Sequence, residues 1–458
     1  MRDILFAILI FGAVPLILAK PWVGVGVWFW VGLMNPHRLA WGFMTTAPVA
    51  MAAGIATLAG LALTRDRRAL PVTPESVLLI LLAVHFSITT YFAWLPDHAF
   101  AQWDKVMKIM LMTAVAPLLI HGKQRTMALM AILALSIGFY GFKGGIYSLQ
   151  GGFGGMVMGP PGSFIRGNTD IGLAMVMVLP LLLILARQVR EGRFELPFFA
   201  PWWQQWAPRA GQALYVGYFL TTAAIVGTHS RGAWITLLAL APLLFLKMRR
   251  KLALVALAFA VVGGVGLTFP DRMVEQWESL QTYEEDASAM GRVQAWGVSY
   301  NLANDYPWTG SGFGTQNLPD NVWESYISWA AAEGGGRRAE HSIYFQILGQ
   351  HGWVGFVLYY SMVAFTLLSL TRLKQRASQT PGALWIAEYA WALRLGVIAF
   401  LIGGAFLSLA YFDLFFAFIA AAIILRRELA EHAAAPSPAA TSSAPLRGPA
   451  HTPTGEAM

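Results

Sequence analysis

The 458-residue chain contains no cysteine, which excludes disulfide bonds and thiolate metal sites. Charged residues are also scarce, at 12%, whereas 57% of the residues are hydrophobic. The mean hydropathy of +0.54 lies outside the range in which a chain of this length stays in aqueous solution. The shortage of charge therefore indicates an integral membrane protein.

Long apolar runs determine the fold class. Runs such as Leu181 to Leu185 do not alternate polar and apolar residues, as the strands of an outer-membrane barrel would. We therefore predict an all-α polytopic membrane protein with about 12 transmembrane helices and one large loop on the outer, non-cytoplasmic face. Six clear segments of about 17 or more mostly apolar residues, enough to cross about 30 Å of hydrocarbon, are 76–95, 105–121, 169–186, 212–228, 252–269 and 342–371.

Basic residues predict the orientation. Six short runs hold 17 of the 32 Lys and Arg residues, and the positive-inside rule places these runs in the cytoplasm. Both termini are then cytoplasmic if residues 3–34 form one broken span, whereas two helices hinged at Lys20-Pro21 would give 13 spans and an outer N-terminus. The net charge of +8 implies contact with anionic membrane lipids, not with nucleic acid. The runs are Arg65/Arg67/Arg68, Lys123/Arg125, Arg187/Arg190/Arg193, Lys247/Arg249/Arg250/Lys251, Arg372/Lys374/Arg376 and Arg426/Arg427.

The domain organisation follows from composition. Residues 1–432 are predicted to form one transmembrane domain, with a large outer loop at about 270–341. A second outer segment, Gly151 to Gly167, is rich in glycine and should be irregular. Residues 433–458 are rich in Ala, Pro, Ser and Thr, which predicts a disordered cytoplasmic tail.

Two outer arginines stand at predicted helix starts. Arg166 precedes a helix that begins near residue 169, with Asn168 as the expected cap, and Arg231 follows the expected cap Ser230. A helix N-terminus carries partial positive charge, so an added arginine is unfavourable there unless an anion lies between them. Both positions therefore predict a phosphate or diphosphate site. The alternative is that each arginine snorkels at the membrane boundary or pairs with an acid such as Asp170.

The outer loop supplies two further candidates. Arg292 lies in a loop with eleven acidic and four basic residues, so a structural ion pair is the alternative to anion binding. His341 lies where the chain re-enters the membrane as a helix that starts near Ser342. A helix N-terminus disfavours the imidazolium, so this histidine is a candidate proton acceptor, or else a hydrogen-bonded boundary residue.

Four motifs carry a resemblance to a known family. They resemble the O-antigen ligase family over roughly residues 160–370, and Met1 to Met44, with Asn35-Pro36-His37-Arg38, looks like its O-glycosylation ligase subgroup. The motifs are His229-Ser230-Arg231-Gly232-Ala233-Trp234, Gly291-Arg292 with Trp296, Asn304-Asp305-Tyr306-Pro307-Trp308-Thr309-Gly310-Ser311-Gly312, and His341-Ser342-Ile343-Tyr344.

The resemblance implies a function and a site. The family comprises inner-membrane glycosyltransferases that use undecaprenyl-diphosphate-linked glycans. Carried over by motif, Arg231 and Arg292, and less closely Arg166, bind the diphosphate of the donor, while His341 activates the acceptor hydroxyl on the periplasmic face. We expect an O-antigen ligase that needs neither metal nor cofactor, inverts the anomeric centre and uses lipid A-core oligosaccharide as the acceptor.

Several alternatives stay open at this point. O-antigen polymerases and bacterial protein O-oligosaccharyltransferases share these motifs, so the acceptor could be a second glycan or a protein. The carboxylate cluster of metal-dependent oligosaccharyltransferases is not evident, since only Asp97 and Asp104 lie near the first outer loops. A lipid-linked glycan transporter is the alternative from another class, and it would need charged groups along an inward-facing path.

Overall fold

The computed structural model describes residues 2–197, 201–247, 287–327 and 338–434. These residues form helices and contain no strand, which confirms the all-α fold class. The helices are α1 (Arg2–Gly12), α2 (Val14–Ala19), α3 (Pro21–Met34), η1 (Pro36–Leu39), η2 (Phe43–Thr45), α4 (Val49–Leu63), α5 (Pro74–Tyr91), α6 (Pro96–Leu119), α7 (Lys123–Gln150), α8 (Asn168–Arg190), η3 (Pro201–Trp206), α9 (Ala207–Gly227), α10 (Arg231–Lys247), α13 (Ala287–Asp305), η4 (Thr315–Asn317), α14 (Asp320–Ser325), α15 (Ile343–Gln379), α16 (Leu384–Gly404) and α17 (Asp413–Ala434).

Helix length and composition support a multi-pass membrane protein. Among the described residues, seven helices are long and apolar enough to cross a membrane, and three shorter apolar helices accompany them. The count of about 12 spans stays a prediction, because charged helices such as α6 and α17 fall outside this set. The predicted span 252–269, much of the outer loop and the tail beyond Ala434 lie outside the described residues.

The first 34 residues fold as a helical hairpin. The segment α1–α2 ends at Lys20, where the backbone leaves the helical region (φ −136°, ψ 78°) because Pro21 follows, and α3 returns. Asp3 Oδ1 accepts hydrogen bonds from the amides of Gly42 and Met44, which follow the far end of α3. The single broken span is therefore wrong for this structure, and the alternative of two helices hinged at Lys20-Pro21 is correct.

The hairpin separates the two ends of the described chain. Lys20 lines a cavity with Asp66 and Arg125, and Arg427 of α17 binds the carbonyls of Pro117 and Ile120 nearby. α17 thus ends at the same end of the bundle as Lys20, whereas Asp3 lies at the other. The two described ends of the chain therefore lie at opposite ends of the bundle, and the cytoplasmic location of both termini stays a prediction.

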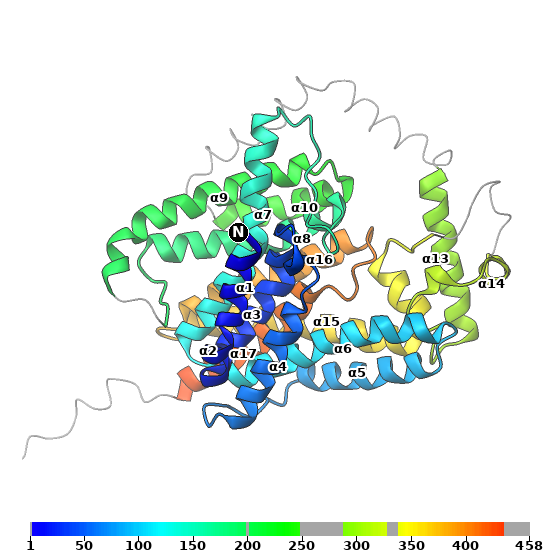
Figure 1. Ribbon diagram of the computed structural model, residues 1–458, viewed down its shortest axis with the longest axis horizontal. Coiled ribbons are helices and arrows are strands. Elements are labelled where there is room, and N and C mark those ends of the chain that lie inside the picture. Colours follow the sequence, from blue (N-terminus) through cyan, green and yellow to red (C-terminus); the bar gives the residue numbers. More distant parts are fainter. Residues whose placement is uncertain (1, 198–200, 248–286, 328–337, 435–458) are drawn as a thin grey trace, which may run out of the picture.

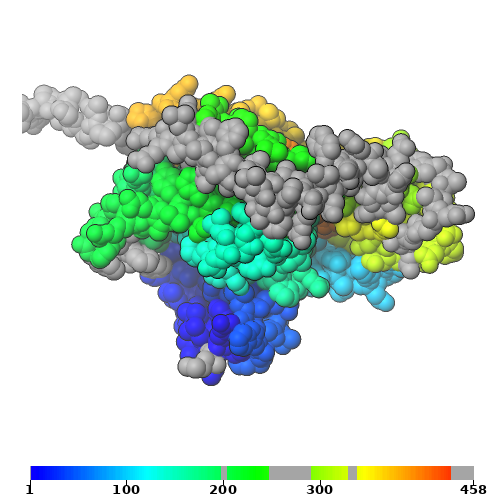
Figure 2. All heavy atoms as spheres, turned by 90° about the horizontal axis from the view of Figure 1, so that it is seen from above, coloured from blue at the N-terminus to red at the C-terminus, as the bar shows by residue number. Residues whose placement is uncertain are grey.

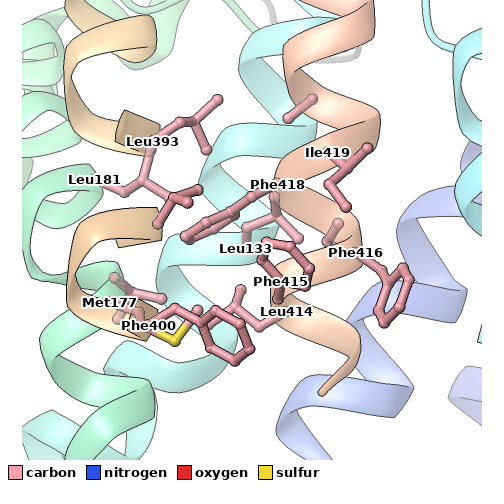
Figure 3. Close-up of a cluster of buried hydrophobic side chains, with 14 of the residues drawn as sticks. Leu133, Met177, Leu181, Leu393, Phe400, Leu414, Phe415, Phe416, Phe418 and Ile419 are labelled. Atoms are coloured by element: carbon pink, nitrogen blue, oxygen red, sulfur yellow. The ribbon is translucent and has the colours of Figure 1, made fainter. Parts of the chain in front are cut away.

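The centre of the bundle is formed by α8, α16 and α17, with α7 against them (Figure 3). The most apolar stretch of α8 is 89% buried, whereas that of Arg2–Ala19 is only 11% buried, so the N-terminal hairpin is peripheral. Figure 2 shows the N-terminal part of the chain, in blue, projecting from one side. A Cβ on Gly396 would lie 2.4 Å from the Phe418 ring, so this glycine permits the close contact between α16 and α17.

α15 is two helices that fold back on each other. The backbone of Gly352 (φ 64°, ψ −171°) is not helical, and it divides the element into 343–351 and 353–379. The rings of Tyr344 and Tyr360, each eight residues from Gly352, stack with centroids 5.2 Å apart. Ala410 binds both arms, because its amide donates to Gln346 Oε1 (3.1 Å) and its carbonyl accepts from the Tyr359 hydroxyl (2.6 Å).

This reversal places His341 deeper in the bundle than Gly352. The first arm of α15 rises for nine residues from Ile343 to His351, or about 13 Å at 1.5 Å per residue. The second arm then runs in the opposite direction, toward the basic residues at its C-terminal end. His341, which precedes the first arm, therefore lies about that much deeper than Gly352, and the single long re-entering helix expected from the sequence is wrong.

The Asn304–Gly312 motif supports the break in α15. The amides of Ser311 and Gly312 donate to the carbonyls of Gly349 and Gln350, both at 3.0 Å, and satisfy groups that the break leaves without helical partners. Gly310 (φ +57°) has no room for a Cβ, which would lie 2.5 Å from the Gly349 oxygen. We name the end of the bundle that carries Arg166, Arg231 and His341 the outer end. We name the end near Lys20 the inner end. Figure 1 shows α13 and α14 at the right edge and the end of α17 on the left.

Candidate functional site

His341 is held between α13, α15 and the segment 405–412. Its backbone is left-handed (φ +41°), a conformation that is uncommon outside glycine and that occurs often at functional sites. Its amide donates to Ser408 Oγ at 3.0 Å. One residue earlier, the Glu340 carbonyl accepts from Trp296 Nε1 of α13 at 2.7 Å, and Trp296 stacks on Phe345. Three elements therefore fix the backbone of His341.

Two guanidinium groups lie near the His341 ring. The pKa of His341 is lowered from its ordinary value of 6.5, first by burial and then by the positive charges of Arg292 and Arg338. Gly291 makes room for Arg338, since a Cβ there would lie 2.5 Å from the Arg338 Cδ. The structure thus brings together two predicted residues, Arg292 and His341, and adds Arg338, which sequence reasoning missed.

Arg292 has no structural acid among the described residues. Its Nε is buried and lacks a hydrogen-bond partner there, although acidic residues are abundant in the surrounding sequence. A buried donor without a partner costs free energy unless a ligand or water satisfies it. The ion-pair alternative for Arg292 stays open, because seven of the eleven acidic residues of the loop lie outside the described residues.

Arg231 begins α10 as predicted. Ser230 Oγ accepts from the amide of Ala233 at 3.2 Å, which confirms Ser230 as the cap. A Cβ on Gly232 would lie 3.7 Å from Phe406, and Phe406 belongs to the same segment as Ser408, which binds the His341 amide. Segment 405–412 therefore connects the start of α10 to the His341 backbone.

Arg166 precedes α8, but the expected cap is wrong. α8 begins at Asn168, with Gly167 at the cap position, because the Asn168 side chain donates instead to the Thr228 carbonyl at 2.9 Å. Asp170 accepts from the Gly167 amide at 3.1 Å and forms no ion pair with Arg166. The Asn168 bond ties the start of α8 to the turn before Arg231, whereas the exposed Arg166 has no contact in this structure that assigns it to the His341 cluster.

The Gly-rich outer segment packs against the same turn. Val157 N donates to the Gly227 carbonyl, and His229 Nε2 lies 2.9 Å from the Phe153 carbonyl. A second missed arginine meets this segment, because a Cβ on Gly162 (φ +71°) would lie 3.2 Å from the Arg38 Cζ. The Arg38 Nε is buried without a hydrogen-bond partner among the described residues. The only sequence signal for Arg38 was its position in the motif Asn35-Pro36-His37-Arg38, to which no functional role was assigned.

Glu340 is a buried acid next to the candidate base. Its side chain is completely buried, and neither carboxylate oxygen has a hydrogen-bond partner in the described part of the chain. Burial raises the pKa of Glu340 to about 7. Sequence reasoning missed this residue, since a glutamate between Ala339 and His341 gives no sign of burial.

A buried hydrogen-bond chain supports segment 405–412. The Tyr411 hydroxyl donates to Gln350 Oε1 at 2.6 Å, so His351 Nε2, 2.8 Å away, donates to the Tyr411 oxygen. His351 Nδ1 then accepts from the Thr89 hydroxyl at 2.7 Å. The chain joins α5, the first arm of α15 and the segment that holds His341, so hydrogen bonds hold these three elements together.

Two parts of the chain match family models. Residues 216–360, which include Arg231, Arg292 and His341, match the family described as O-Antigen ligase. This chain carries an O-antigen ligase family domain. Residues 1–190, which include Arg38 and Arg166, match a family of unknown function (DUF5935). A search of the curated proteins found no match. The O-antigen ligase resemblance noted from the sequence is therefore confirmed, and it implies ligase-type activity on lipid-linked glycan donors.

Proposed function

We propose that this protein is an O-antigen ligase that transfers glycan from undecaprenyl diphosphate to lipid A-core oligosaccharide on the periplasmic face of the inner membrane. The observation that carries the proposal is the grouping of His341 with Arg292 and Arg338 inside an O-antigen ligase family domain. A diphosphate is the dianionic group that guanidinium forks bind best, and a neutral histidine beside it is positioned to accept a proton.

The chemistry requires one displacement at the anomeric carbon. The acceptor oxygen forms a bond to that carbon while the bond to the diphosphate oxygen breaks, and the hydroxyl proton passes to His341. Undecaprenyl diphosphate leaves with the bonding electrons, and the configuration inverts because the acceptor attacks the face opposite the leaving group. Arg292 and Arg231 stabilise the negative charge that develops on the diphosphate. Such electrostatic stabilisation is the largest single contribution to catalysis in many enzymes. Guanidinium charge supplies this stabilisation without a metal ion in our proposal.

Donor binding should strengthen the base. In the free protein, burial and the charges of Arg292 and Arg338 lower the pKa of His341, which keeps the imidazole neutral and ready to accept a proton. A bound diphosphate neutralises the two guanidinium groups, and the pKa of His341 then rises. The histidine therefore becomes a stronger base only when a donor is present, which favours transfer over idle proton uptake.

The transporter alternative lacks support at the inner end. Glu388, one of the charged residues that an inward path would use, is buried and bound by Gln188 and Arg193 at 2.8 and 3.0 Å. Such a satisfied ion pair is typical of a structural contact. The polymerase and protein-glycosylating alternatives share the proposed chemistry and differ only in the acceptor.

The test is transfer by the purified protein in liposomes with EDTA present. Lipid-linked glycan is the donor, and rough lipopolysaccharide, a second lipid-linked glycan and a candidate protein are supplied in turn. We expect product with rough lipopolysaccharide. In His341→Ala, transfer should fall by about 10²–10⁴ while donor binding persists, and the acid limb of the rate should vanish.

His432→Ala is the matched control, because His432 is an exposed histidine at the inner end, near the Pro381 carbonyl. It should retain wild-type transfer. Product with a different acceptor would reassign the activity within the family, and near-normal turnover of a folded His341→Ala variant would remove His341 from the mechanism.

A further inference from the structure

Two adjoining cavities lie at the inner end, far from His341. The first has a volume of about 630 Å³ and lies between the α2–α3 turn, the residues after α4 and the start of α7. Its lining includes three cations, Lys20, Lys123 and Arg125, and one carboxylate, Asp66. Asp66 binds Arg125 at 2.6 Å, and Glu195, just outside the lining, binds Lys123 at 2.5 Å. The lining itself therefore carries more basic than acidic side chains.

The second cavity is an apolar groove of about 560 Å³ along α3 and α7. It begins at Trp22 and Arg125, which line both cavities, and reaches Met34 at the end of α3 and Phe139 near the middle of α7. The fourteen helical steps from Arg125 to Phe139 span about 21 Å, more than half of a bilayer's hydrocarbon thickness of about 30 Å. The groove is therefore long enough for an acyl chain that descends from one leaflet.

The two cavities have the chemistry of one amphipathic ligand. A basic pocket between transmembrane helices on the cytoplasmic side is typical of a site for anionic lipid headgroups. Trp22 stands where the polar and apolar cavities meet, and the Arg125 Cζ lies 5.4 Å from its ring centroid. Tryptophan prefers this headgroup level of a membrane.

We propose that these cavities bind one anionic phospholipid, with its phosphate near Lys20, Lys123 and Arg125 and an acyl chain in the groove between α3 and α7. The occupant is a lipid of the inner leaflet and not the glycan donor, because the basic pocket lies at the opposite end of the helices from His341. The bound lipid would fasten the projecting N-terminal hairpin (Figure 2) to α7. Because it binds the folded protein, it raises stability by mass action.

The test measures lipid binding and thermal unfolding of the delipidated full-length protein. Phosphatidylglycerol should raise the melting temperature and remain bound in native mass spectrometry, whereas phosphatidylcholine, with no net charge, should do neither. Lys20→Gln and Lys123→Gln should each weaken phosphatidylglycerol binding about fivefold, which corresponds to the roughly 1 kcal/mol of one basic residue at an anionic headgroup. The matched controls Arg372→Gln and Arg376→Gln remove exposed inner-end cations of α15 and should leave binding unchanged.

A groove variant tests the acyl chain separately. Ala128→Phe fills the groove and should reduce binding of phosphatidylglycerol, whereas Ala59→Phe, at an exposed position of α4 outside both cavities, should not. Equal stabilisation by phosphatidylcholine, or unchanged binding in both lysine variants, would overturn the proposal. So would displacement of phosphatidylglycerol by undecaprenyl phosphate, since the cavities would then belong to the isoprenoid lipid. Transfer activity is not the readout, so failure here leaves the proposed enzyme untouched.

Discussion

The arginines at the inner and outer ends of this protein differ in what they contact. At the inner end, Arg193 Nη1 lies 3.0 Å from Glu388 Oε2, and Arg125 Nη2 lies 2.6 Å from Asp66. At the outer end, Arg38, Arg292 and Arg338 form no ion pair with a carboxylate within the part of the chain that the structure describes. Partly buried cations are costly without an anion, so this difference between the described residues supports our proposal that the outer groups bind a ligand.

Two buried glutamates repeat the contrast. Glu388 is 4% exposed and receives hydrogen bonds from Gln188 and Arg193. Glu340 is 0% exposed, and its carboxylate has no partner among the described residues. The inner carboxylate is therefore satisfied by its partners, whereas the outer one is expected to cost stability. Such a cost is expected near a site that must remain available for a substrate.

The largest expected effect concerns activity at the outer end. Arg292→Lys keeps the charge but loses the fork that contacts two phosphate oxygens, so transfer should fall about 10²–10³-fold. Thermal unfolding should change little, because no acid pairs with Arg292 in the described structure. Arg193→Lys at the inner end is the control and should retain turnover. If the folded Arg292→Lys enzyme had wild-type transfer, the outer arginine would not differ in function from the inner one.

The next effect is on stability and separates the two glutamates. The pKa of Glu340 is about 7 in the folded protein and 4.5 ordinarily. As pH rises from 4.5 to 7, the unfolded chain ionises first, and the folded state loses about 3 kcal/mol that it does not regain at higher pH. Glu340→Gln should therefore be more stable than wild type at pH 8 by up to about this amount, and little different at pH 4.

The comparison with Glu388→Gln gives this prediction a control. That substitution removes an ion pair with Arg193, so it should lower the free energy of unfolding at pH 8. Denaturation of both variants at the two pH values measures the difference. If Glu340→Gln instead destabilised the protein at pH 8, Glu340 would have a partner that stabilises its charged form.

Arg193→Ala should have a smaller effect on stability. The substitution leaves Glu388 buried with one fewer hydrogen-bonding cation, and we expect a loss of about 2 kcal/mol in the free energy of unfolding. This loss is below the roughly 3–5 kcal/mol of a fully buried pair, because Arg193 is partly exposed. Arg187, 3.7 Å from Glu388, limits the loss further. Arg338→Ala at the outer end is the comparison, and thermal unfolding should show it to be nearly neutral.

Sequence patterns predicted local features of the site better than the depth of His341 in the bundle. The helical class, the Ser230 cap and the proximity of Arg292 to His341 follow from composition, capping preference and family resemblance. The reversal at Gly352 does not, because a glycine in an apolar run is tolerated in a straight helix, and only its contacts with Pro307 and Ser311 reveal the break.

The other errors also arose where residues distant in sequence determine the local structure. Asn168 is a good cap by residue type, but the Thr228 carbonyl, sixty positions away, takes its side chain. The hairpin at Lys20 was the less favoured alternative, since the Asp3 bonds that fix it join residues about forty positions apart. The burial of Glu340 likewise depends on helices that are remote in sequence, and charge alone suggested a surface position.

The smallest expected effect tests whether donor binding changes the base. The acid limb of kcat/KM for the donor reports His341 in the free enzyme, where burial and the charges of Arg292 and Arg338 lower its pKa. The acid limb at saturating donor reports the complex, in which the diphosphate offsets those charges. Because the rate falls as His341 becomes protonated, the second limb should lie at higher pH than the first.

Arg338→Gln sharpens this comparison, because it removes one of the two charges that act on His341 in the free enzyme. The acid limb of kcat/KM should then move to higher pH and approach its position at saturating donor, whereas Arg376→Gln at the inner end should leave both limbs in place. Turnover at pH 8 separates this role from simple loss of structure, since at that pH the imidazole is neutral in either protein. If the two acid limbs coincide in the wild type, the outer arginines do not couple diphosphate binding to the pKa of His341. The outer arginines would then differ from the inner arginines only in contributing to the affinity for the donor.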